Sequence, residues 1–252
     1  MKRAAICFSP WGMELIEKLN LNARDKKIEE FEQFACGDFA LIPGFTGISD
    51  SLTKWTGKMF ENKTDILFVG AMGIAVRAIA PFVKDKLSDS AVVVMDDMGK
   101  YVIPVLSGHV GGANKLSGIV GELTGATPVI TTSTDVHNVF SGDTFAKENN
   151  LSIGNKDGIK KVNLKAIEGK NITISVKDYP PSKPVDIIVA DDTDREYSLL
   201  LKPKKYILGL GMKKDCDHKK LEDFVLENLE KKGVDITDIY CVATIDIKEN
   251  EP

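Results

Sequence analysis

The residues best suited to chemistry are concentrated in one short segment, residues 107–114, which reads SGHVGGAN. It combines a hydroxyl, an imidazole and an amide with three glycines, and it lies between an apolar stretch and a predicted helix. Glycines let a backbone approach a ligand closely, and the N–H groups at a helix start attract anions. A purely structural connection needs neither the hydroxyl nor the imidazole, so we expect the active site here.

His109 is the candidate general base, because an imidazole titrates nearest neutral pH. The amides of Gly111, Gly112 and Ala113 are candidates for stabilising an oxyanion. The structural alternative for His109 is a buried, hydrogen-bonded imidazole with no catalytic role.

Ser107 is either a nucleophile or a hydrogen-bond donor. Residue 105 is Val rather than Gly, so Ser107 does not lie in the G-x-S-x-G turn of serine hydrolases. Asn114 could orient a ligand or could simply be a helix N-cap. The sequence does not decide between the two roles of either residue.

Two further segments could bind polar ligand groups. Gly70-Ala71-Met72-Gly73 follows an apolar strand and opens a helix, and Arg77 would add a cation one turn later. Residues 131–135 form a hydroxyl-rich run after the strand predicted at 128–130. The structural alternatives are a tight turn without a ligand and local capping of turns and helices.

The remaining polar motifs favour structural roles. Asp96 and Asp97 lie in a predicted hairpin turn, where Asp side chains commonly accept hydrogen bonds from the backbone of their own turn. Gly209-Leu210-Gly211 lacks the third glycine of a dinucleotide fingerprint. His137 and His218 have no ligand spacing to His109, so we predict no metal site.

Composition restricts the classes of protein to which this chain can belong. Its 252 residues are 43% hydrophobic and 28% charged, which argues for a folded protein. The formal net charge of −4 gives no sign of the excess of basic residues that is typical of nucleic-acid-binding proteins. No apolar run reaches the ~18 residues that span a membrane. Four scattered cysteines without a CxxC pair indicate reduced thiols, so we expect a cytoplasmic protein.

Alternating strand and helix patterns predict an α/β fold in three parts. Residues 1–145 read as a layered α/β N-terminal domain that carries the glycine-rich site, with a hairpin over 91–105. Residues 146–205 read as a small β-rich middle domain with a proline-rich turn at 178–184. Residues 206–252 read as one βαβ unit, the start of a C-terminal α/β domain that we expect to be truncated.

Five blocks between residues 66 and 135 resemble the cobalamin biosynthesis protein G family, CbiG. They are residues 68–77, residues 80–86 (Ala80-Pro81 and Lys84-Asp85-Lys86), residues 89–94, residues 106–114, and residues 125–132 with Asp135. The similarity extends more loosely over the rest of the chain. One departure is the segment 211–215, where the family often has a Cys-Arg-Arg-Gly-type turn.

The resemblance implies a cobalt-precorrin-5A hydrolase that opens a ring A δ-lactone and releases carbon 20 as acetaldehyde. Fitted to this chemistry, the candidate catalytic residues are His109, which would activate water, and Ser107 and Asn114, which would orient the lactone or the water. The candidate residues for holding the substrate are Gly70, Gly73, Arg77, Gly108, Gly111, Gly112, Thr131, Thr132 and Asp135.

The resemblance also implies the partners. Cobalt belongs to the tetrapyrrole substrate, so no cofactor of the protein itself is expected. Transient contacts with neighbouring pathway enzymes are expected, and contacts with nucleic acid or a membrane are not. The alternative is a non-catalytic corrinoid-binding or carrier protein, which would return its ligand unchanged.

Overall fold

The computed structural model describes residues 2–37, 42–48, 50–85, 87–176, 184–212 and 216–245. Contacts divide the chain into two compact units, residues 1–136 and residues 137–252, and each is described by itself. Residues 178–183 of the expected proline-rich turn, Lys86 and residues 213–215 lie outside the described residues.

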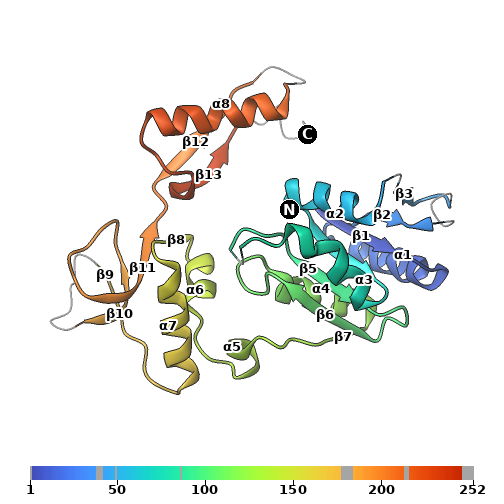
Figure 1. The fold of residues 1–252 in the computed structure, drawn as a ribbon, viewed down its shortest axis with the longest axis horizontal. Coiled ribbons are helices and arrows are strands. Elements are labelled where there is room, and N and C mark those ends of the chain that lie inside the picture. The colour runs from blue at the N-terminus through green and yellow to red at the C-terminus, as the bar shows by residue number, and fades with distance from the viewer. Residues whose placement is uncertain are drawn as a thin grey trace. The chain divides into compact units, whose positions relative to one another are not determined.

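The first unit is built on a seven-stranded sheet with the strand order β3-β2-β1-β4-β5-β6-β7 (Figure 1). All neighbouring strands in it are parallel except β5 and β6, which form the predicted antiparallel hairpin. The strands are β1 (Arg3–Cys7), β2 (Glu32–Ala35), β3 (Thr46–Gly47), β4 (Asp65–Val69), β5 (Val92–Met95), β6 (Tyr101–Leu106) and β7 (Thr127–Pro128).

Helices cover both faces of this sheet, as a parallel sheet requires. One core packs the apolar sides of α1 (Pro10–Asp25) and α4 (Ala113–Thr124) against alternate strand residues such as Cys7 and Val69. The other core packs α2 (Leu52–Glu61) and α3 (Met72–Ile79) against the residues between them, such as Ile6 and Phe68. A short 3₁₀ turn, η2 (Ala80–Phe82), follows α3 and contains Pro81, whose ring is incompatible with a helix interior.

Local signals account for the helix ends. Ser9 caps α1 by accepting a hydrogen bond from the Gly12 amide, and Pro10 occupies the first helical position. Ser51 caps α2 in the same way. Gly125 ends α4 in the left-handed conformation, which glycine adopts readily.

The reversed direction of β6 decides where the loops of the first unit lie. Val102 of β6 stands opposite Met95 of β5, and Leu106 stands opposite Val92. The end of β6 therefore lies at the edge of the sheet where β5 begins. Because β7 runs parallel to β6, the chain leaves β7 at that same edge.

The second unit contains a four-stranded sheet with the order β8-β11-β10-β9 (Figure 1). Its strands are β8 (Leu151–Ile153), β9 (Ile174–Val176), β10 (Val185–Val189) and β11 (Tyr197–Pro203). The helices are α6 (Gly142–Glu148) and α7 (Lys156–Ile167), and α7 packs on β11. The region is thus mixed α/β rather than β-rich, since α7 buries Ile159 and Val162 in its core.

The boundary between the units also differs from the expected one. The first unit ends at Val136, after the single turn α5 (Ser133–Val136), instead of near residue 145. The cause is α6, which belongs to the second unit. The Gly142 amide at its start donates to Asn163 Oδ1 of α7, and Asn163 Nδ2 donates to Asp143 Oδ1.

The chain from residue 206 forms the predicted βαβ unit, with β12 (Tyr206–Gly209), α8 (His218–Lys231) and β13 (Ile239–Ala243), and the turn η3 (Ile236–Asp238) precedes β13. The two strands pair in parallel. No residue of α8 is buried, and Ile207, Phe224 and Val242 are all more than half exposed.

Within the described part of the chain, no helix combines the length and apolarity needed to cross a membrane.

Candidate functional site

The segment 107–112 forms a tight loop between β6 and α4, held by its own backbone. The Ala113 amide donates to Ser107 O at 3.1 Å, and the Asn114 amide donates to Gly108 O at 3.0 Å. Two residues take left-handed backbone angles, Ser107 with φ +60° and Gly112 with φ +95°. Glycine accepts that conformation readily, whereas serine does so at a cost of about 1–2 kcal/mol.

Gly111 is required by close packing within this loop. A Cβ at this position would lie 2.2 Å from Ser107 Cβ and 2.8 Å from Ser107 O. No side chain fits there without moving the backbone. Gly111 therefore has a structural reason to be glycine, in addition to any role in approaching a ligand.

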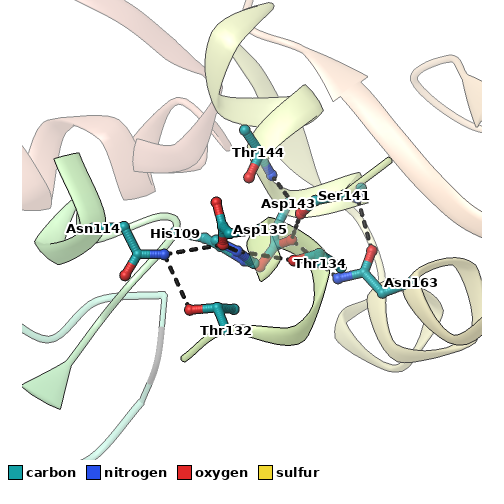
Figure 2. A network of polar contacts seen from close by, with 10 residues as sticks. His109, Asn114, Thr132, Thr134, Asp135, Ser141, Asp143, Thr144 and Asn163 are labelled. Atoms are coloured by element: carbon teal, nitrogen blue, oxygen red, sulfur yellow. Dashed lines mark hydrogen bonds and ion pairs between the residues drawn. The ribbon is translucent and has the colours of Figure 1, made fainter. Parts of the chain in front are cut away.

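His109 forms a hydrogen-bonded pair with Asp135, as Figure 2 shows. Its Nε2 lies 2.6 Å from Asp135 Oδ2 and 3.1 Å from Thr134 Oγ1. The His109 side chain is 12% exposed and that of Asp135 is 39% exposed. A carboxylate only accepts hydrogen bonds, so Nε2 carries the hydrogen and Nδ1 is the basic nitrogen of the neutral ring.

Asn114 belongs to the same network and is not the helix N-cap. The N-cap of α4 is Gly112, and Asn114 lies two positions further into the helix. Its Nδ2 donates to Thr132 Oγ1 and to Asp135 Oδ2, both at 3.0 Å (Figure 2). The N-cap alternative for Asn114 is therefore wrong, and its role in the site stays a prediction.

The start of α4 provides two candidate donors for an oxyanion. The amides of Gly111 and Gly112 make no hydrogen bond to any described residue. The third amide that the sequence suggested, that of Ala113, is already engaged by Ser107 O, so its inclusion was wrong. A helix start with open N–H groups favours developing negative charge.

Ser107 is buried, with 7% of its surface exposed, and its Oγ has no hydrogen-bond partner among the described residues. A buried polar group without a partner costs about 1–3 kcal/mol. A nucleophilic serine requires a base within hydrogen-bond reach. Because Ser107 Oγ is not bonded to His109, this conformation does not contain an assembled Ser–His pair.

The structure brings together only part of the predicted site. Ser107, Gly108, His109, Gly111, Gly112, Asn114, Thr132 and Asp135 lie at the edge where β6 and β7 end. Gly70 lies at the opposite edge, where its amide donates to Met95 O. The two ends of β5 are about 10 Å apart along the strand at ~3.3 Å per residue.

Gly70, Gly73 and Arg77 thus lie at the other edge of the sheet from His109, and their role in holding the substrate stays a prediction. They form a separate group, in which the Arg77 guanidinium lies over Gly73, 3.4 Å from where a Cβ would stand. Thr131 is exposed, and within the described part of the chain its side chain forms no hydrogen bond to the His109 network. Its role in holding a ligand stays a prediction.

Asp96 of the hairpin turn bonds the backbone of its own turn. Asp96 accepts hydrogen bonds from the amides of Met98, Lys100 and Tyr101, which confirms its predicted structural role.

Within the described ranges, no group of three or more His, Cys, Asp or Glu side chains could hold a metal ion.

Sequence reasoning missed Thr134, whose hydroxyl lies beside His109 Nε2. The signal was available, since Thr134 lies within the hydroxyl-rich run 131–135 that the sequence had singled out. Figure 2 also draws Ser141, Asp143 and Asn163, which cap and connect α6 and α7 in the second unit.

Comparisons with known proteins identify the family of the chain. Residues 54–135 match the family model "Cobalamin synthesis G N-terminal", and residues 206–252 match "Cobalamin synthesis G C-terminus". A curated relative from Salmonella typhimurium, named cobalt-precorrin-5A hydrolase, is 29% identical over 99% of this chain and 76% of its own length. A relative of the same name from Priestia megaterium is 25% identical over 98% of this chain and 75% of its own length.

A solved structure shows a similar fold. It is described as a cobalamin biosynthesis protein G homolog from Sulfolobus solfataricus, with a TM-score of 0.50 and 23% identity over 98% of this chain and 75% of that one. The first family match contains the whole His109–Asp135 network, and the second begins at the first residue of β12. The chain belongs to the cobalamin synthesis G family.

Proposed function

We propose that this chain is a cobalt-precorrin-5A hydrolase of anaerobic cobalamin biosynthesis and that its reaction takes place at His109. The observation that carries the proposal is the His109–Asp135 pair, with Nε2 and Oδ2 2.6 Å apart, at the start of a helix with open amides. Membership of the family and the names of the relatives supply the substrate class.

The first step is opening of the ring A δ-lactone. His109 Nδ1 takes a proton from water, and the hydroxide adds to the lactone carbonyl carbon. The carbonyl oxygen becomes an oxyanion that accepts hydrogen bonds from the Gly111 and Gly112 amides. Collapse of this intermediate breaks the bond from the acyl carbon to the ester oxygen, leaving a carboxylic acid and an alkoxide on carbon 20.

The second step releases carbon 20. The alkoxide becomes the carbonyl of acetaldehyde as the bond from carbon 20 to the macrocycle breaks. The bonding electron pair passes to the conjugated macrocycle, which takes up a proton, and His109, protonated in the first step, can return one. The product is cobalt-precorrin-5B, and the overall reaction involves no net oxidation or reduction.

Water attack fits the described geometry better than an acyl-Ser107 route. Ser107 Oγ is buried without a hydrogen-bond partner among the described residues, and Ser107 Cβ lies close to Gly111. A route through Ser107 would need His109 to reach that hydroxyl first. In this proposal Ser107 shapes the loop, and water is the nucleophile.

Asp135 has an orienting role in this reaction. It accepts the Nε2 hydrogen of His109, which holds the ring in the tautomer with a basic Nδ1, and it stabilises the imidazolium that forms. Cobalt enters with the substrate as part of the macrocycle. The proposed setting is the cytoplasm, alongside the enzymes that make and consume these intermediates.

The direct test is acetaldehyde release from anaerobically prepared cobalt-precorrin-5A, with the product mass measured in parallel. Acetaldehyde with a matching loss of mass supports the hydrolase. A macrocycle that binds and returns unchanged in mass contradicts it and supports the carrier function. Performing the reaction in ¹⁸O-labelled water places the label in the new carboxylate.

A further inference from the structure

We propose that Asn114 is a positioning residue for Asp135, and that Gly108 is glycine so that the Asn114 amide can occupy that position. On this view neither residue needs to touch the substrate. They act on His109 through the Asp135 carboxylate. This inference deepens the proposed function and rests on it for its kinetic readout only.

The first observation is that Asp135 Oδ2 accepts two hydrogen bonds. One comes from His109 Nε2 at 2.6 Å and the other from Asn114 Nδ2 at 3.0 Å. The orientation of the Asn114 amide is determined, because its oxygen facing a carboxylate would be repelled. Asn114 Nδ2 also donates to Thr132 Oγ1, which anchors the amide to the segment that carries Asp135.

The second observation is that the oxygen of the Asn114 amide lies close to Gly108. Asn114 Oδ1 is buried with no hydrogen-bond partner in the described structure. A Cβ on Gly108 would lie 2.9 Å from this oxygen and 3.3 Å from both Cγ and Nδ2. Gly108 has no positive φ, so an alanine there would conflict with the Asn114 amide rather than with its own backbone.

Asp135 depends on such support. It lies in α5, a single helical turn, and its side chain is 39% exposed. Without the Asn114 bond, its carboxylate can turn toward water and leave His109 Nε2. A displacement of about 1 Å in a catalytic group can cost about 100-fold in rate.

Four variants test this chain of contacts: Asn114→Ala, Gly108→Ala, the double variant of both, and Gly118→Ala. Gly118 is the matched control, because it lies in α4 with no atom within 4 Å of an added Cβ. Asn114→Ala and Gly108→Ala should each lower kcat by about 10- to 100-fold with KM changed less than about threefold. The double variant should be no worse than Asn114→Ala, because the clash disappears with the amide.

A second readout needs no substrate. Long-range ¹H–¹⁵N correlation spectra resolve both ring nitrogens of the protein's three histidines, with His109 assigned from a His109→Gln variant. In the wild type and in Gly118→Ala, Nε2 of His109 should show a protonated, strongly hydrogen-bonded shift. In Asn114→Ala and Gly108→Ala it should move toward the value of the exposed His218.

The outcomes separate the two proposals. An unchanged His109 signal in Asn114→Ala overturns the inference, whatever the activity. A double variant much worse than Asn114→Ala overturns the role of Gly108. If the signal moves as expected but the wild type releases no acetaldehyde, the positioning inference stands and the proposed function fails.

Discussion

His109 Nε2 and Asp135 Oδ2 lie 2.6 Å apart although 26 residues separate them in the chain. Their proximity follows from strand direction. His109 follows β6, Asp135 follows β7, and these two strands are parallel neighbours. Ligands of α/β sheets commonly bind beyond the carboxyl ends of such strands.

Replacing His109 by Ala should lower kcat for acetaldehyde release by about 10²–10⁴-fold, because the general base is lost. Binding of the macrocycle should change little. Turnover and equilibrium binding, measured in parallel, separate the two effects. His218→Ala, an exposed histidine of α8, is the control and should leave both unchanged. Full turnover by His109→Ala would remove His109 from the mechanism.

Replacing Ser107 by Ala should leave kcat within about tenfold of the wild type, since water is the proposed nucleophile and Oγ has no hydrogen-bond partner among the described residues. Mass spectrometry during turnover should find no covalent adduct on the wild-type protein. Loss of turnover in Ser107→Ala together with an acyl adduct in the wild type would establish the acyl-Ser107 route.

Replacing Gly111 by Ala should disrupt the loop, because the new Cβ would stand 2.2 Å from Ser107 Cβ and 2.8 Å from Ser107 O. Overpacking of this kind typically costs about 1–3 kcal/mol of unfolding free energy. Urea unfolding measures the loss, and the acetaldehyde assay should show turnover falling with it. Gly118→Ala is again the control, and an alanine in a helix should stabilise it by up to about 1 kcal/mol. Equal stability of the two variants would contradict the packing argument.

Asp186 should make the second unit sensitive to acid. Burial favours a higher pKa for this carboxyl, but hydrogen bonds from Lys165 and Thr173 outweigh it and lower the pKa below 3.8. A carboxyl with a lowered pKa stabilises the fold above its unfolded pKa and loses that contribution as the pH falls through the folded value.

Hydrogen exchange of β10 and α7 measures this effect. Opening should become easier in the wild type as the pH falls below about 4, and Asp186→Asn should lack this part of the pH dependence. At neutral pH, Asp186→Asn should already open more readily, because hydrogen bonds to a charged group contribute about 1.5–3 kcal/mol. Asp194→Asn, at an exposed carboxylate, is the control. Identical pH profiles for the wild type and Asp186→Asn would contradict this assignment.

The Cys7 thiol should be inert in the native protein. Burial, with the nearby Asp97 charge and Cys36, raises its pKa from 9.0 to about 12. The reactive thiolate is therefore scarce at pH 8. Iodoacetamide followed by peptide mass spectrometry should label the exposed Cys241 quickly and Cys7 only after unfolding. Labelling of native Cys7 at the rate of Cys241 would show that β1 opens far more easily than its burial implies.

Local patterns were sufficient for much of the first unit. The β5–β6 hairpin, the apolar strands, α3 and its break at Pro81, and α4 with its Gly125 end all follow from short-range rules of periodicity and capping. The helix α7 was missed although Ile159, Val162 and Ala166 of its sequence, KDGIKKVNLKAI, recur at helical spacing and are buried. The strand that α7 packs on, β11, lies far away in the sequence.

The sequence by itself determined which residue types are available for chemistry and that they follow strands. It identified His109, Asn114, Thr132 and Asp135, but it left their partners open. Only the tertiary structure decided that these four share one network while Gly70, Gly73 and Arg77 lie at the other edge. The physical reason is the direction of β6, because a reversed strand moves its loop to the opposite edge of the sheet. The hairpin signal predicts that β6 reverses, but the pairing of β6 with β7 joins segments that are distant in the sequence, and no local pattern records it.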